Sequence, residues 1–204
     1  MARQRDTDDV ELAKDFRISH YRAALDNAAT GRQVIADAIH RRFTERYLDP
    51  ITDPPSEQRH GFAMMAIACL MIEALQSFRC GWPDTSKKGD AKYAFCSFFD
   101  EHSDFAPFRG HAGDFYKSVR CGILHQAETT NGWRIRRDQA QLLTETSTGL
   151  IVDAKRFTDA LSKALDRYRD DLKEAPWDGE LWKNLKDKME RVCSNCKSVS
   201  KAVA

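Results

Sequence analysis

The sequence has no long hydrophobic run and no excess of charge of either sign. Its longest apolar stretch, Phe62 to Leu75, is interrupted by Glu73 and is shorter than the roughly 20 residues that a membrane-spanning helix needs. The 204 residues carry 32 Lys and Arg against 31 Asp and Glu, a formal net charge of +1. This balance excludes a globally basic binder of nucleic acid or membrane, although a local basic patch is compatible with it.

An apolar stretch is also missing from the N-terminus, so the sequence offers no secretory signal. We therefore expect a cytoplasmic protein whose six cysteines are reduced thiols. Cys193 and Cys196 have the spacing of half a zinc knuckle, but a structural zinc site needs four ligands. The sequence has no second Cys-x-x-Cys pair and no His after Cys196. We expect no metal site and no cofactor.

Apolar residues recur with helical spacing over most of the chain, which predicts a mainly α fold. The central stretch of the predicted helix 57–80 is apolar on nearly every face, as in a helix at the centre of a bundle. Aromatic residues at 93–99 are expected in the same core. The predicted helices cover residues 10–25, 34–43, 57–80 (with Ser56 as N-cap), 91–102, 114–127, 154–172 and 181–192. The first two stretches fit either two helices or one bent helix.

Residues 131–152 have a different pattern. Asn131-Gly132 is a turn signal, Trp-Arg-Ile-Arg alternates with period two, and Thr148-Gly149 separates two further short strand-like runs. We expect a small antiparallel β insertion here, before the C-terminal helices. The sequence thus predicts a tail at 1–9, a single helical-bundle domain at 10–192 that includes the insertion, and a frayed C-terminus at 193–204.

Three titratable residues stand out within the segments expected to form the core. Glu73 lies in the most apolar helix, where a carboxylate must be paired, protonated or open to a site. It either faces a Lys or Arg at the wet end of the helix or orients a catalytic group. Arg120 and His125 lie five residues apart, which on an ideal helix is about 140° around the axis. An imidazole suits proton transfer near neutral pH, and a guanidinium suits a phosphate.

At this stretch the sequence resembles the HEPN superfamily, small helical bundles whose motif is Arg-x(4–6)-His near the start of a late helix. Arg120-Cys-Gly-Ile-Leu-His125 has the four-residue form. The preceding apolar helix, the β insertion and the following helix extend the resemblance over about residues 57–175. In active members of the family the residue after the Arg is often Asn, Asp or His, whereas this chain has Cys121.

The resemblance implies a metal-independent endoribonuclease of a prokaryotic toxin–antitoxin or antiviral defence system, with an antitoxin or other regulatory protein as a partner. Two motifs from two protomers would form one composite site in a homodimer, and cleavage of RNA would leave a 2′,3′-cyclic phosphate. Arg120 and His125 are then the catalytic residues. The candidate supporting residues are Glu73, Tyr116, Lys117, Cys121 and Gln126.

A basic cluster near the motif is a candidate RNA-binding surface. Arg134, Arg136 and Arg137 lie beside Trp133, so the cations could follow an RNA backbone while the indole stacks on a base. A solvated strand face accounts for these arginines equally well. Two alternatives to the nuclease therefore stay open. One is a non-catalytic module that binds a nucleotide, a nucleic acid or a protein, and the other is a structural dimerisation unit.

Overall fold

The computed structural model describes residues 10–52, 60–85 and 90–196. Helices account for most of the described residues, which confirms the mainly α fold class. The chain divides into two compact units, one formed by Met1–Arg42, Phe78–Pro83 and Tyr168–Ala204 and the other by Phe43–Ser77 and Asp84–Arg167. The tail predicted at 1–9, the Asp-Pro-Pro break at 53–55 and the Ser56 cap lie outside the described residues.

The first unit is built from helices α2 (Ile18–Leu25), α3 (Ala28–Phe43, as far as Arg42) and α10 (Glu180–Asn195), with the end of α9 (Ala154–Glu174). Trp182 of α10 is fully buried, and its indole Nε1 donates a hydrogen bond to the carbonyl oxygen of Leu172 at 2.9 Å. Lys173 forms an ion pair with Asp37. Helix α10 continues through Cys193 to Asn195, so the frayed C-terminus predicted from 193 is wrong for these three residues.

The N-terminal part of the helix predicted over 10–25 is a β-hairpin instead. Strand β1 (Glu11–Ala13) pairs antiparallel with β2 (Phe16–Arg17), and α2 begins only at Ile18. Asp15 adopts a left-handed backbone conformation, with φ 60°, and so reverses the chain between the two strands. Leu12 and Phe16 are both buried. Because their spacing of four also fits one face of a helix, the apolar pattern could not separate the two structures.

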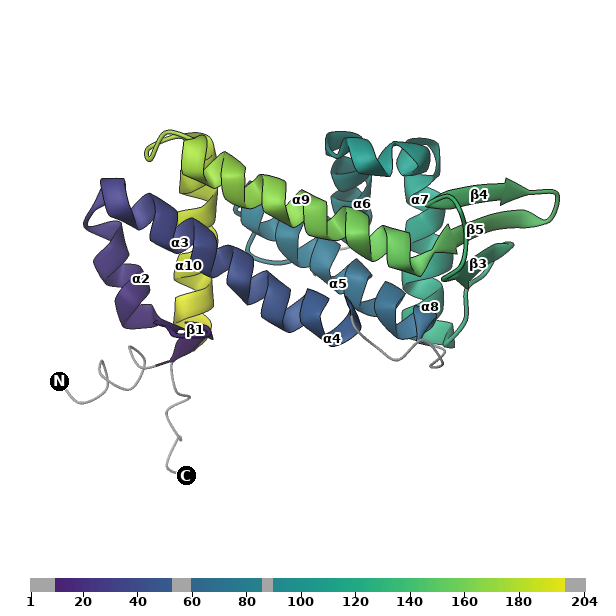
Figure 1. The fold of residues 1–204 in the computed structure, drawn as a ribbon, viewed down its shortest axis with the longest axis horizontal. Helices are drawn as coiled ribbons and strands as arrows, with labels where there is room; N and C mark the ends of the chain where they lie inside the picture. The colour runs from purple at the N-terminus through teal and green to yellow at the C-terminus, as the bar shows by residue number, and fades with distance from the viewer. Residues whose placement is uncertain (1–9, 53–59, 86–89, 197–204) are drawn as a thin grey trace, which may run out of the picture. The chain divides into compact units, whose positions relative to one another are not determined.

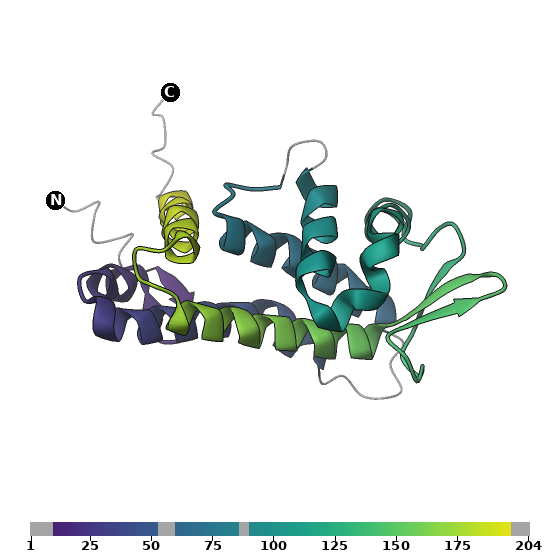
Figure 2. The same cartoon turned by 90° about the horizontal axis from the view of Figure 1, so that it is seen from above.

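The second unit is organised around an aromatic cluster. Helix α6 (Asp90–Glu101), a 3-10 segment (Ser103–His111) and α7 (Ala112–Phe115) contribute phenylalanines that pack on Phe157 of α9. Figure 2 shows α6 and α7 standing beside the N-terminal half of α9. Every phenylalanine of the cluster is fully buried, whereas Tyr93, expected in this core, is exposed. The cluster consists of Phe95, Phe98, Phe99, Phe105, Phe108, Phe115 and Phe157.

The β insertion is present, but its topology is mixed rather than antiparallel. Strands β3 (Trp133–Arg136), β4 (Leu143–Thr146) and β5 (Gly149–Asp153) form a sheet in the order β3-β5-β4, which Figure 1 shows. β4 and β5 are antiparallel across the predicted turn, whereas β3 runs parallel to β5. Gln139 donates its backbone N–H to Asp153 at the end of β5. Residues 137–142, which connect β3 to β4, therefore cross the end of the sheet at which β5 finishes. Strand β5 takes the central position between β3 and β4.

Two helices of the second unit carry the residues of the Arg-x4-His motif and Glu73. Helix α5 (Gly61–Cys80) belongs to this unit up to Ser77. It is long and apolar enough to cross a membrane, but 61% of its most apolar window is buried, as in the core helix of a soluble protein. The helix predicted at 114–127 is observed over 112–126, as α7, a π-helical turn at Tyr116–Arg120 and α8 (Cys121–Gln126). The Cys121 N–H bonds to the Tyr116 carbonyl, five residues back. Single π-turns within helices occur frequently at functional sites.

Candidate functional site

Arg120 and Glu73 form an ion pair between the π-turn and α5. The Arg120 Nε donates to Glu73 Oε1 at 2.8 Å, and the two side chains are 17% and 10% exposed, respectively. Burial by itself lowers the pKa of Arg120, but the hydrogen bond and negative charge of Glu73 outweigh it and the pKa is raised. The guanidinium is therefore charged at any pH at which the protein is folded.

Glu73 is held on its other side by Thr85. The Thr85 hydroxyl donates to Glu73 Oε2 at 2.9 Å, so each carboxylate oxygen has one protein donor. Glu73 is therefore paired with an arginine, as one sequence-based interpretation expected, but at a buried position rather than at the wet end of the helix. Because its partner is the motif arginine itself, the other interpretation, that Glu73 orients a catalytic group, stays a prediction. Thr85 carries no signal in the sequence, because it belongs to a polar stretch and no local pattern connects it to α5.

The Arg120 guanidinium also lies close to the Tyr116 ring and to the Cys121 side chain. Its Cζ lies 5.6 Å from the centroid of the Tyr116 ring, a cation–π distance. Burial, and then the hydrogen bond with Cys121, raise the pKa of Tyr116, so its hydroxyl stays protonated. Cys69 lies four residues before Glu73 on α5 and is buried. Burial, and then the charge of Glu73, raise the pKa of its thiol. The predicted supporting residues Glu73, Tyr116 and Cys121 therefore surround Arg120.

His125 belongs to the next turn and is exposed, as are Lys117 and Gln126. Within the described part of the chain, no hydrogen bond joins Arg120 to His125. Gly122, between them, is buried because the chain folds back there: a Cβ at this position would lie 2.5 Å from the carbonyl oxygen of Glu128. The helix is distorted at the π-turn, Tyr116–Arg120, whereas Gly122 lies in the regular helix α8 that carries His125.

An apolar strip on α5 runs into the Glu73–Arg120 pair. Phe62, Ala66, Leu70 and Glu73 fall within about 80° of one another around an ideal helix. Phe62 and Leu70 are 36% and 44% exposed, and Leu124 of α8 is 42% exposed. Apolar side chains of this size on the surface are typical of an interaction site when they are contiguous.

Of the predicted RNA-binding residues, the tryptophan is buried and the three arginines have partners within the protein. Trp133 is 4% exposed, and its ring packs edge-on against Phe115, so the predicted base-stacking role of this indole is wrong. The first position of β3 faces the aromatic core, and the alternation that identified the strand also placed the indole inward. The arginines have protein partners: Arg134 donates to Thr148, Arg136 makes two bonds to Asp138, and Arg137 contacts His60.

Among the residues at 10–52, 60–85 and 90–196, no group of three or more His, Cys, Asp and Glu side chains is placed to hold a metal ion. The six cysteines, including Cys193 and Cys196, are free thiols. Comparisons with models of known protein families, with curated protein sequences and with solved structures find no match.

Proposed function

We propose that this protein is a cytoplasmic endoribonuclease of the HEPN type that cleaves RNA without a metal ion, with Arg120 and His125 as its catalytic residues. The observation that carries the proposal is the clamped guanidinium. Glu73 accepts from Nε, and the Cys121 side chain is also hydrogen-bonded to Arg120, but among the described residues no oxygen accepts from its two terminal nitrogens. The fork of the side chain therefore keeps two donors for the oxygens of a phosphate.

The chemistry divides between the two residues. The His125 imidazole takes the proton of the 2′-OH, whose oxygen attacks the adjacent phosphorus, and the bond to the 5′ oxygen breaks. A proton returned to that 5′ oxygen completes the step and leaves a 2′,3′-cyclic phosphate. Arg120 stabilises the additional negative charge on the phosphorane oxygens. Its permanent charge, maintained by Glu73, suits this role.

A second copy of the chain brings an arginine and a histidine together in the proposed site. Arg120 and His125 diverge around their helix by about 140°, so one protomer presents them in different directions. A two-fold axis places the Arg of one protomer near the His of the other. The strip on α5 formed by exposed Phe62 and Leu70, with half-buried Ala66 between them, ends at Glu73 and offers an apolar surface for that contact. Light scattering at micromolar concentration should give the mass of a dimer.

The test is cleavage of a mixed RNA by the purified protein in EDTA. Arg120→Lys keeps the charge but loses the fork, and we expect a loss of about 10²–10³ in rate. His125→Ala should abolish cleavage, whereas His40→Ala, which removes a histidine from the other unit, should leave it unchanged. Cleavage of a fully 2′-deoxy substrate, or undiminished cleavage by His125→Ala, refutes the mechanism.

The Glu73–Arg120 pair also favours a second function, a catalytically silent module that binds a nucleotide, a nucleic acid or a protein partner. A partly buried ion pair makes the fold sensitive to the loss of either partner, whether or not the protein performs any chemistry. In that case the purified protein shows no cleavage of any RNA, and Arg120→Lys chiefly lowers the melting temperature. A toxin–antitoxin or antiviral role, with a regulatory partner, belongs to the nuclease proposal and fails with it.

A further inference from the structure

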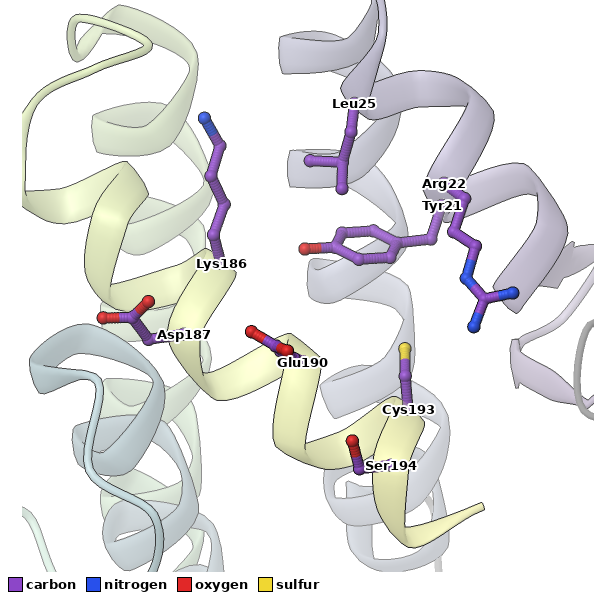
Figure 3. Close-up of a pocket in the computed structure, with 8 residues that line it drawn as sticks. All are labelled: Tyr21, Arg22, Leu25, Lys186, Asp187, Glu190, Cys193 and Ser194. Atoms are coloured by element: carbon purple, nitrogen blue, oxygen red, sulfur yellow. The ribbon is translucent and has the colours of Figure 1, made fainter. Parts of the chain in front are cut away.

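A pocket of about 350 Å³ lies between α2 and α10 in the first unit, away from the motif on the chain. This volume is at the lower end of the range for small-molecule sites. Tyr21 and Leu25 of α2 form one wall, and α10 forms the other with Lys186, Asp187 and Glu190 among its residues. Figure 3 shows the Tyr21 side chain reaching across the gap toward α10.

Tyr21 is the feature that indicates a ligand. The residue is 4% exposed, and its hydroxyl has no hydrogen-bond partner among the described residues. Burial, with the nearby Cys193 and Glu190 contributing further, raises its pKa, so the hydroxyl is neutral. An unsatisfied buried hydroxyl costs free energy unless a donor or acceptor reaches it. Tyr21 lines the pocket and its side chain points toward α10 (Figure 3), so a bound molecule that reaches the hydroxyl can satisfy it.

The charges around the pocket determine which molecule fits. Lys186 is committed elsewhere: its Nζ donates to the carbonyl oxygen of Trp177 at 3.0 Å and lies 3.9 Å from the centroid of the Trp177 ring. Arg22 has an interaction of its own. The carboxylates of Asp187 and Glu190 make no hydrogen bond or ion pair within the described residues. The groups without a partner among the described residues therefore include two carboxylates and the neutral Tyr21 hydroxyl, and all three can accept hydrogen bonds.

We propose that this pocket binds a small organic cation, an alkylamine or alkylguanidine. Glu190 pairs with its charged group, the Tyr21 oxygen accepts one N–H, and the Leu25 side chain covers the aliphatic part of the molecule. A cation next to the tyrosine ring gains further from its negative face. The proposal is independent of the nuclease, because all of its residues belong to the first unit.

The experiment is isothermal titration of the full chain with agmatine, which carries both an amine and a guanidine, and with glutarate as an anion of similar length. We expect agmatine to bind saturably with one site and a Kd of about 1 mM or tighter, and glutarate not to bind. Tyr21→Phe removes one hydrogen bond and should weaken binding about fivefold. Glu190→Gln removes the charge and should weaken binding at least about tenfold.

Glu180→Gln is the matched control, because it removes the same charge from the same helix at an exposed position outside the pocket. Agmatine affinity within twofold of the original chain is expected for this variant. An equal loss in Glu180→Gln and Glu190→Gln indicates general charge attraction and overturns the proposal. No heat of binding with agmatine up to 10-fold above the expected Kd, or binding of glutarate instead, also overturns it. Melting temperatures of all variants exclude loss of folding as the cause.

Discussion

Removing the Glu73 side chain tests how strongly the ion pair holds the candidate site together. Glu73 bonds to Arg120 Nε at 2.8 Å and to the Thr85 hydroxyl at 2.9 Å. Glu73→Gln is nearly isosteric: its amide oxygen still accepts from Arg120, and its amide nitrogen can donate to the Thr85 oxygen. Glu73→Ala loses both bonds and leaves the guanidinium, only 17% exposed, without its counter-charge.

The two substitutions should differ in size for this reason. Replacing charge-assisted hydrogen bonds by neutral ones costs about 1–2 kcal/mol of unfolding free energy. Removing one partner of a buried pair costs about 3–5 kcal/mol, because the other charge stays desolvated. At about 2–4 °C per kcal/mol for a chain of this length, Glu73→Gln should lower the melting temperature by about 2–8 °C. Glu73→Ala should lower it by clearly more.

Urea unfolding followed by circular dichroism measures both values, with Glu174→Ala as the control for removing an exposed carboxylate from a helix. A double-mutant cycle with Arg120→Met isolates the pair, and we expect a coupling energy of about 2 kcal/mol. If Glu73→Ala costs no more than Glu174→Ala, or if the two substitutions are additive within about 0.5 kcal/mol, the ion pair is not the stabilising contact inferred here.

Three further predictions follow from individual contacts. Gly122→Ala should destabilise the fold by about 1–3 kcal/mol, since its Cβ would meet a backbone oxygen at 2.5 Å, whereas Gly110→Ala, where a Cβ meets nothing within 4 Å, should be neutral in the same unfolding assay. Thr85→Val should reduce RNA cleavage several-fold while Thr85→Ser retains it, because the hydroxyl is the group of Thr85 that binds Glu73 Oε2. Equal rates refute this positioning role. The hydrogen bond from Arg136 lowers the pKa of Asp138 from 3.8 to about 2. The stabilisation that the Arg136–Asp138 hydrogen bond provides is therefore present above about pH 4 and is lost as the pH falls through about 2. An NMR titration checks the pKa, and Arg136→Gln should return it toward the ordinary value.

The sequence located the helices well because their apolar faces repeat over many residues. The segments predicted at 91–102 and 114–127 are observed within two residues of these limits. Periodicity failed where the elements are short. The β1–β2 hairpin places Leu12 and Phe16 inward with the spacing that a helix also has, and the left-handed Asp15 carries no pattern of its own.

The candidate site shows the same division. The motif spacing singled out Arg120 and His125, and the isolated charge in an apolar helix singled out Glu73. Both are local properties of the sequence. That Glu73 pairs with Arg120, 47 residues away, depends on how α5 packs against the π-turn. Thr85 enters only through that packing, because its hydroxyl is one of many along the chain until the fold places it beside the carboxylate.

The residue types and their periodicity therefore determined which segments become helices and which polar side chains must find partners in the core. Free energy of burial acts on each amphipathic segment separately, so it can be inferred from a short window of sequence. Partner choice and strand order are different, because they depend on contacts between distant segments. Only the tertiary structure packed the Trp133 ring against Phe115, inserted β5 between β3 and β4, and placed Tyr21 at a pocket between α2 and α10.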